Sequence, residues 1–182
     1  MADTNSSEHE KAVEALTDEM SCSINSAILQ PGPSQVLPNL YLGSFDDAQN
    51  FDKLEKLGIS HVLNMAHGTN MLLDSPMYVP YGIKYKGLHA WDSETFDISI
   101  YFDETYEFIL QALESNGKIL VNCAAGVSRS ATIVIHFIHR YSAEKGTIEN
   151  VKTIRDAILF VQGKRPIIWP NQGFLKQLLI YE

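Results

Sequence analysis

The strongest constraint on the fold is the segment 121–130, with the sequence VNCAAGVSRS, because of what flanks it. The run 118–121 is short and rich in β-branched residues, as in a buried strand, whereas the apolar run 131–138 is long enough for a buried helix. The residues between them are mostly small and include Gly126. The sequence therefore predicts a strand, a tight turn and a helix N-terminus, where backbone N–H groups and the helix dipole favour a bound anion.

Two side chains of this turn indicate chemistry. Cys123 follows the predicted strand, and a thiol at such a position has its pKa lowered to roughly 3.5–7.5. Arg129 comes six positions later and offers a planar, two-pronged donor that fits phosphate oxygens. The pattern predicts a thiolate nucleophile that faces a bound phosphate.

Displacing an alcohol or phenol from phosphorus also requires an acid that protonates the leaving oxygen. Asp92 is the preferred candidate, because it follows a predicted strand at 83–88 whose carboxyl end would abut the turn if that strand neighbours the central one. Glu94 in the same loop is the alternative acid. Asp97 fits better as the N-cap of the helix that follows.

Length and composition fit one domain with a substantial core in an intracellular compartment. Its 182 residues are 45% apolar, and no apolar run is long enough to span a bilayer. There is no signal-peptide pattern, and Cys22 and Cys123 are not expected to form a disulfide, so we expect a reducing compartment, the cytoplasm or also the nucleus. Residues 1–20 hold six acidic side chains and one lysine, most of the net charge of −8, and no basic stripe is present. Nucleic acid and membranes are therefore not expected partners.

The chain divides into an acidic N-terminal segment with a linker, 1–33, and one domain, 34–182. The segment contains a weak amphipathic helix at 8–20, with a disordered tail as the alternative. In the domain, strands alternate with helices, which predicts a single α/β domain with a central, mostly parallel sheet flanked by helices. The expected elements are a hairpin at 36–43, helices at 44–57, 99–113, 131–141, 147–161 and 172–181, strands at 59–65, 83–88 and 118–121, and loops at 67–82, 89–97 and 164–171.

The segment from Cys123 to Ser130 resembles the Cys-x5-Arg-Ser signature of cysteine-based protein phosphatases. Three further segments are similar to the atypical (vaccinia H1-related) dual-specificity phosphatases: 40–43 with 59–65, 92–102, and 165–175. The resemblance covers 36–182 and implies a protein tyrosine phosphatase-like fold, no metal or other cofactor, and a pocket that admits phosphotyrosine, phosphoserine and phosphothreonine. Phosphorylated proteins, with kinases among the candidates, are the implied partners.

The resemblance also implies residue roles. Cys123 would form the phosphocysteine, Arg129 would bind the phosphate and the transition state, and Asp92 would act first as general acid and then as general base. Ser130 would donate a hydrogen bond to the sulfur and ease breakdown of the intermediate, and Asn171 would steady the phosphate turn. The backbone that wraps the phosphate would be that of Ala124, Ala125, Gly126, Val127, Ser128 and Arg129.

One position departs from the family pattern. Family members usually have a histidine immediately before the cysteine, and this chain has Asn122. Asparagine donates hydrogen bonds but cannot carry a charge. A weakened hydrogen bond costs about 1 kcal/mol, which corresponds to roughly one pKa unit. We therefore predict a thiolate that forms at higher pH and a slower, still active, enzyme.

Two other functions stay open at this stage: a phosphatase-like scaffold that binds phosphoproteins, and a phosphatase for phosphoinositide, glucan or RNA 5′ phosphate. The oligomeric state is not predicted. Structural roles are expected for His136 and His139 rather than metal binding, and for Lys164 and Arg165, the latter in an ion pair, rather than a second anion pocket. Cys22 is expected to be an incidental thiol.

Overall fold

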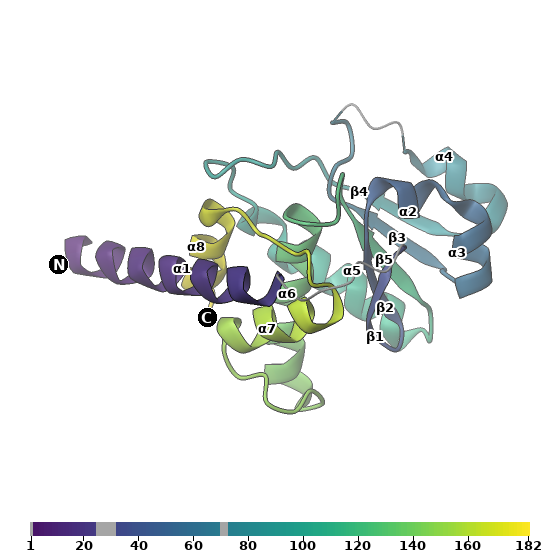
Figure 1. The fold of residues 1–182 in the computed structure, drawn as a ribbon. Coiled ribbons are helices and arrows are strands. Elements are labelled where there is room, and N and C mark those ends of the chain that lie inside the picture. Colours follow the sequence, from purple (N-terminus) through teal and green to yellow (C-terminus); the bar gives the residue numbers. More distant parts are fainter. Residues whose placement is uncertain (1, 25–31, 70–72) are drawn as a thin grey trace.

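The computed structural model describes the backbone of residues 2–24, 32–69 and 73–182. Its centre is a five-stranded sheet in the order β1-β2-β5-β3-β4 (Figure 1). β1 (Ser34–Leu37) pairs antiparallel with β2 (Leu40–Gly43), and the pairs β2–β5, β5–β3 and β3–β4 are parallel, with β5 at Ile119–Asn122, β3 at His61–Asn64 and β4 at Lys84–Gly87. The predicted α/β fold with a mostly parallel sheet is confirmed.

The two faces of the sheet are covered by different helices because side chains alternate along each strand. Leu63, Ile119 and Val121 belong to the larger core, and Val62 and Leu120 to the smaller one. The larger core is built with α5 (Phe102–Glu114), α6 (Arg129–Lys145), α7 (Ile154–Lys164) and α8 (Gln172–Ile180). The smaller core is built with α2 (Phe45–Gln49), α3 (Phe51–Leu57) and α4 (Ser75–Tyr78), on the other side of the sheet in Figure 1.

The register brings the ends of the parallel strands level with one another. Asn122, the last residue of β5, lies opposite Gly43 of β2 and Asn64 of β3, and Asn64 lies opposite Gly87 of β4. The condition attached to Asp92 is not met: β4 does not neighbour β5, because β3 lies between them. The loop after β4 must therefore cross the end of β3 to reach the residues that follow β5, and an isolated bridge between Ala66 and His89 marks that crossing.

Within the domain, two of the expected helices differ most from the structure in their bounds, and competing caps explain both. The helix expected at 44–57 is interrupted at Asn50, whose side chain accepts a hydrogen bond from the backbone N–H of Lys53 and starts α3. The helix expected at 147–161 begins at Ile154, because Thr153 and Asp156 form a capping box. The loop expected at 67–82 contains α4 and the 3-10 turn η1 (Val79–Tyr81) outside its undescribed residues 70–72.

The N-terminal segment forms α1 (Ala2–Ile24), longer than the helix expected at 8–20. Val13, Leu16 and Met20 are buried in the larger core, and α1 lies against α7 and α8. The amide Nε2 of the buried Gln162 donates to the backbone oxygen of Met20 at 3.1 Å. Helix α1 is therefore packed on the domain through one apolar face.

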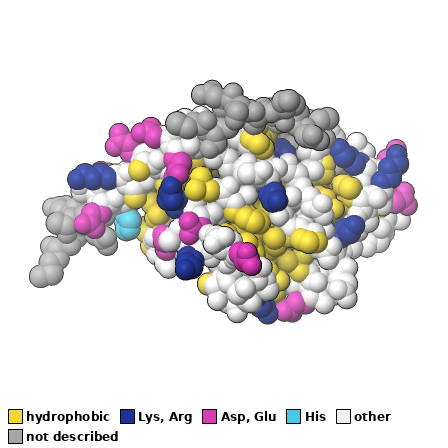
Figure 2. Space-filling model, turned by 60° about the horizontal axis from the view of Figure 1, so that its bottom comes forward, with side chains coloured by type: hydrophobic (Ala, Val, Ile, Leu, Met, Phe, Trp, Pro, Cys, Tyr) yellow, Lys and Arg dark blue, Asp and Glu magenta, His cyan; other side chains and the backbone are white. Residues whose placement is uncertain are grey.

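The surface matches the mixed charge of the sequence. On the face shown in Figure 2, lysine and arginine side chains are dispersed among acidic and apolar ones and form no continuous basic patch among the described residues. No described helix combines the length and the apolar character needed to cross a membrane.

Candidate active site

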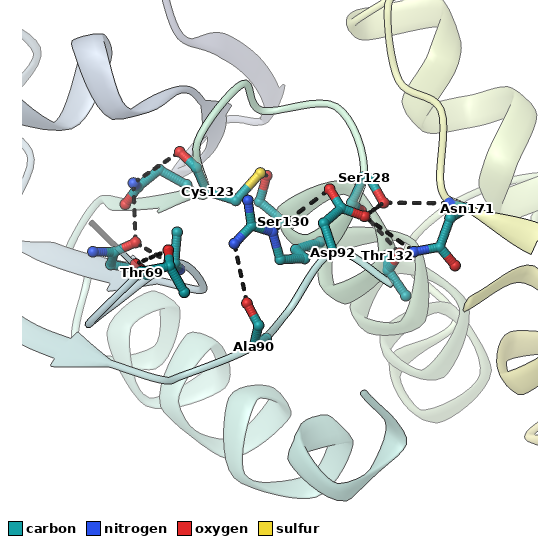
Figure 3. A network of polar contacts seen from close by, with 12 residues as sticks. Thr69, Ala90, Asp92, Cys123, Ser128, Ser130, Thr132 and Asn171 are labelled. Carbon is teal, nitrogen blue, oxygen red and sulfur yellow. Dashed lines mark hydrogen bonds and ion pairs between the residues drawn. The ribbon is translucent and has the colours of Figure 1, made fainter. Parts of the chain in front are cut away.

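Cys123 lies at the carboxyl end of β5, at the start of the turn that leads into α6 (Figure 3). Its side chain is 1% exposed. The hydroxyl of Ser130, in the first turn of α6, donates to Cys123 Sγ at 3.2 Å. The hydrogen bond expected from Ser130 is therefore present, and its catalytic role stays a prediction.

Residues outside the turn after Cys123, residues 124–128, hold it by donating hydrogen bonds to its carbonyl groups. Their hydrogen bonds are Phe45 N to Ala124 O at 2.9 Å, Arg165 Nη2 to Ala125 O at 3.3 Å, Arg165 Nε to Gly126 O at 2.9 Å and Trp169 N to Val127 O at 2.8 Å. In a trans peptide the N–H points opposite to the C=O. The N–H groups of residues 125–128 therefore point to the inner side of the turn, where an oxyanion would be bound.

Gly126 is the residue that allows this turn to close. Its φ is +69°, and a Cβ at this position would lie 2.5 Å from the backbone oxygen of Gly43 and 2.8 Å from Arg165 Nη2. Any other residue would displace either the end of β2 or the guanidinium group.

Arg129 begins α6 and is 7% exposed. Its Nη1 donates to the backbone oxygen of Ala90 at 3.0 Å, and its Nε lies 3.6 Å from Asp92 Oδ2. The guanidinium group is thus aligned by the loop that carries the predicted acid.

Asp92 lies over the N-terminus of α6 (Figure 3). Its Oδ1 accepts hydrogen bonds from Ser128 Oγ at 2.7 Å and from Asn171 Nδ2 at 3.0 Å. The structure thus brings Asp92 to Arg129 and Ser128. Asp92 and Glu94 are both exposed, so these contacts, and not burial, distinguish the two. The geometry favours Asp92 over Glu94 as the acid.

The loop of Asp92, residues 89–99, is fixed by α8. Gln177 Oε1 accepts from the backbone N–H groups of Ile98 at 2.8 Å and Ser99 at 3.0 Å, and its Nε2 donates to Phe96 O at 2.9 Å. A Cβ on Gly173 would lie 1.9 Å from Glu94 O, so α8 and the loop touch at a glycine. Sequence reasoning missed both residues as parts of the site, because nothing in the sequence shows that α8 lies against this loop.

Asn171 has three contacts. Its Oδ1 caps α8 by accepting from Phe174 N at 3.0 Å, its Nδ2 donates to Asp92, and its backbone N–H donates to Ser128 Oγ at 3.3 Å. Asn171 is predicted to steady the phosphate turn. Its backbone N–H contacts that turn at Ser128, and its side chain contacts the candidate acid.

Asn122 is fully buried behind the nucleophile. Its Nδ2 lies 3.4 Å from both Asn64 Oδ1 and Cys123 O, which are long hydrogen bonds, and its Oδ1 has no partner among the described residues. Asn64 Nδ2 donates to the Tyr85 hydroxyl at 3.0 Å. Burial raises the pKa of Tyr85 to about 12, and its hydroxyl also lies 3.1 Å from His67 Nδ1.

The remaining candidates have structural positions. Arg165 is buried, and its hydrogen-bond partners are neutral oxygens and not the carboxylate of the expected ion pair. His136 stacks on Phe102, with ring centroids 4.1 Å apart. Within the described ranges no group of three or more metal-ligating side chains occurs. The Cys22 side chain lies outside the described residues.

Comparison with known proteins gives a consistent picture. Residues 40–182 match the family "Dual specificity phosphatase, catalytic domain". The chain is 45% identical over 146 residues to human dual specificity protein phosphatase 26, covering 80% of this chain and 64% of that protein. It is 40% identical over 151 residues to the MAP kinase phosphatase with leucine-rich repeats protein 3 of Dictyostelium discoideum, covering 82% of this chain and 16% of that protein. The chain therefore spans less than two thirds of the length of these curated relatives.

Two solved structures show the same arrangement of elements. The crystal structure of DUSP15 is 32% identical with a TM-score of 0.70, and the match covers 84% of this chain and 88% of that one. The human tyrosine phosphatase-like serine/threonine/tyrosine-interacting protein is 32% identical with a TM-score of 0.67, covering 84% and 96%.

Proposed function

Since the chain belongs to the dual-specificity phosphatase family, we propose that it hydrolyses phosphotyrosine and phosphoserine or phosphothreonine in proteins through a phosphocysteine intermediate. One observation carries this proposal: the buried Cys123 lies at the start of a turn whose N–H groups face inward, with Ser130 on its sulfur. Asp92 and Arg129 meet at the same turn. A nucleophile, an oxyanion cradle and an acid are the three parts that the reaction requires.

In the first step, the Cys123 thiolate attacks phosphorus, an S–P bond forms and the P–O bond to the leaving group breaks. Asp92 gives its proton to the leaving oxygen, while Arg129 and the N–H groups of the turn bind the equatorial oxygens. In the second step, Asp92 takes a proton from water, the water oxygen attacks phosphorus and the S–P bond breaks. Ser130, which donates to Sγ, stabilises the departing thiolate, and inorganic phosphate is released.

We also propose that Asn122 makes this enzyme slower than relatives with a histidine before the nucleophile. Its hydrogen bonds are 3.4 Å long, and its own side chain and that of Asn64 are uncharged amides. In the variant Asn122→His, we expect the pH midpoint of iodoacetate alkylation to fall by about one unit and kcat at neutral pH to rise. An unchanged midpoint would show that the asparagine serves the thiolate as well as a histidine does.

Phosphorylated proteins in a reducing intracellular compartment, the cytoplasm or also the nucleus, are the proposed substrates. Kinases are candidates among them, because one relative is named a MAP kinase phosphatase. A phosphoprotein-binding scaffold is the second candidate function. It is favoured by Asn122 and by the similar structure named as a phosphatase-like interacting protein. A scaffold requires no nucleophile and acid together, and this chain holds both.

The deciding experiment compares the wild-type chain with Cys123→Ser on a generic aryl phosphate and on a panel of phosphopeptides. Cys22→Ser is the matched control, because it removes the other cysteine of the sequence. We expect hydrolysis by the wild type and by Cys22→Ser, and none by Cys123→Ser. Activity that survives Cys123→Ser would overturn the mechanism. Tight phosphopeptide binding by an inactive wild type would instead support the scaffold.

A further inference from the structure

Arg165 is a buried cation directly behind the phosphate turn. It follows the last residue of α7, and its side chain is 5% exposed. Its guanidinium donates to Gly126 O at 2.9 Å, to Ala125 O at 3.3 Å, and to Gly32 O and Ser34 Oγ at 3.3 Å each. Four of its five N–H groups are thus engaged with the protein, so it does not offer a binding site for a second phosphate.

These partners are all neutral, which is unusual for a buried charge. Burying a guanidinium costs several kcal/mol unless a negative charge compensates it. Burial lowers the pKa of Arg165, and the negative charges of Asp47 and Cys123 oppose that shift. Asp47 Oδ2 accepts hydrogen bonds from the backbone N–H and the hydroxyl of Ser44, at 2.8 and 3.0 Å. These hydrogen bonds come from neutral groups and leave the charge of Asp47 in place, so Asp47 and the thiolate or bound phosphate are the negative charges that can compensate Arg165.

The hydrogen bonds of Arg165 also fix the direction of two peptide groups. Because the carbonyls of Ala125 and Gly126 point to the guanidinium, the N–H groups of Gly126 and Val127 must point to the other side, towards the phosphate position. Rotating either peptide would lose a hydrogen bond in a buried place and leave a donor unpaired. Gly126 fits against Arg165 so closely that a Cβ would lie 2.8 Å from Nη2.

We propose that Arg165 is a positioning residue of the phosphate turn, which turns two N–H groups towards the oxyanion and supplies from behind the fixed positive charge that the neutral Asn122 cannot supply. The inference rests on the proposed function, since it assumes that Cys123 acts as a thiolate. Among the described residues, Arg129 at the start of α6 and Asp92 in the loop after β4 also lie at the phosphate turn, and Asp47 in α2 acts on Arg165. Arg129 and Asp92 partly neutralise each other at 3.6 Å.

Two variants separate the charge of Arg165 from its hydrogen bonds. Arg165→Gln removes the charge, whereas Arg165→Lys keeps the charge and cannot reproduce the fork of donors to two carbonyls. The first readout is the pH midpoint of iodoacetate alkylation of Cys123, and the second is the dissociation constant of orthovanadate. Neither requires turnover, so a failure of this inference is distinguishable from a failure of the proposed function, which the aryl phosphate assay tests.

For Arg165→Gln we expect the alkylation midpoint to rise by about one unit, near the lower end of the roughly 1–3 units that a nearby opposite charge produces, and vanadate affinity to fall about tenfold. For Arg165→Lys we expect a midpoint within a few tenths of a unit of the wild type and a similar loss of vanadate affinity. A folded Arg165→Gln with an unchanged midpoint would refute the electrostatic part. If the glutamine variant does not fold, Arg165→Lys alone decides the positioning part, because wild-type vanadate affinity in that variant would refute it.

Discussion

Asp92→Asn provides the sharpest test of how the site works, because the substitution removes a proton donor and leaves the contacts almost unchanged. The oxygen of the asparagine can still accept from Ser128 and Asn171, which lie 2.7 and 3.0 Å from Oδ1 in the wild type. The contact that changes is with Arg129 Nε at 3.6 Å, and the Asp92 side chain is 38% exposed. A partly solvated pair of this kind contributes less than about 1 kcal/mol.

The expected loss of activity is larger than that. A positioned general acid contributes about 10²–10⁴-fold, and a hundredfold loss corresponds to about 2.7 kcal/mol at about 1.36 kcal/mol per factor of ten. We therefore expect Asp92→Asn to keep the unfolding midpoint within a few degrees and to lower kcat/KM for a phosphotyrosine peptide about a hundredfold or more. A large loss of kcat/KM with an almost unchanged unfolding midpoint cannot come from a packing defect.

The assay uses two substrates that differ in leaving group. The phenolate of tyrosine needs a proton to leave, whereas nitrophenolate is a weaker base and needs it less. We expect the loss in kcat/KM to be several times smaller for p-nitrophenyl phosphate than for the phosphotyrosine peptide. Glu94→Gln, in the same loop, is the control and should change neither value. Equal losses for both substrates, or a loss of the same size in Glu94→Gln, would refute the assignment of the acid.

Three further predictions follow from single contacts. Gly126→Ala should abolish measurable vanadate binding, because the added Cβ meets backbone at 2.5 Å, whereas Gly146→Ala, with a similar φ but open space around it, should keep it. Gln177→Ala should lower kcat/KM for a phosphotyrosine peptide by about tenfold and that for p-nitrophenyl phosphate less, since the loss of three hydrogen bonds at about 1 kcal/mol each loosens the loop of Asp92. Burial lowers the pKa of His136 to about 4 from 6.5, so the unfolded chain binds more protons than the folded chain between these pH values. The free energy of unfolding should therefore fall, by up to about 3 kcal/mol, as the pH drops through this range. His136→Gln should flatten that pH dependence in urea titrations; an unchanged slope would contradict it.

The residues predicted from the sequence are those whose position depends on local order. Cys123, Ser128, Arg129 and Ser130 lie within eight consecutive residues, and a strand, a turn and a helix in direct succession leave few alternatives for their arrangement. Asp92 was identified because the chemistry needs an acid. The condition that its strand neighbours the central one is not met, since β3 separates β4 from β5 and the loop crosses the end of β3.

The fold class was predicted for the same local reason, from strands that alternate with helices along the chain and from the apolar run 131–138. The helix bounds near 50 and 153 were not predictable from apolar periodicity, because a side-chain cap overrides it at each of these places.

By itself, then, the sequence determined the fold class and the thiolate turn, since both depend on neighbours along the chain. Only the tertiary structure decided what surrounds that turn. Gln177 reaches its loop across 79 positions and Arg165 reaches Gly126 across 39, and the hydrogen bonds at both places depend on how separate helices pack. The long hydrogen bond from Asn122 to Asn64, 58 positions away, likewise depends on tertiary packing. Side-chain orientation across such separations is set by packing geometry, which residue type and spacing do not specify.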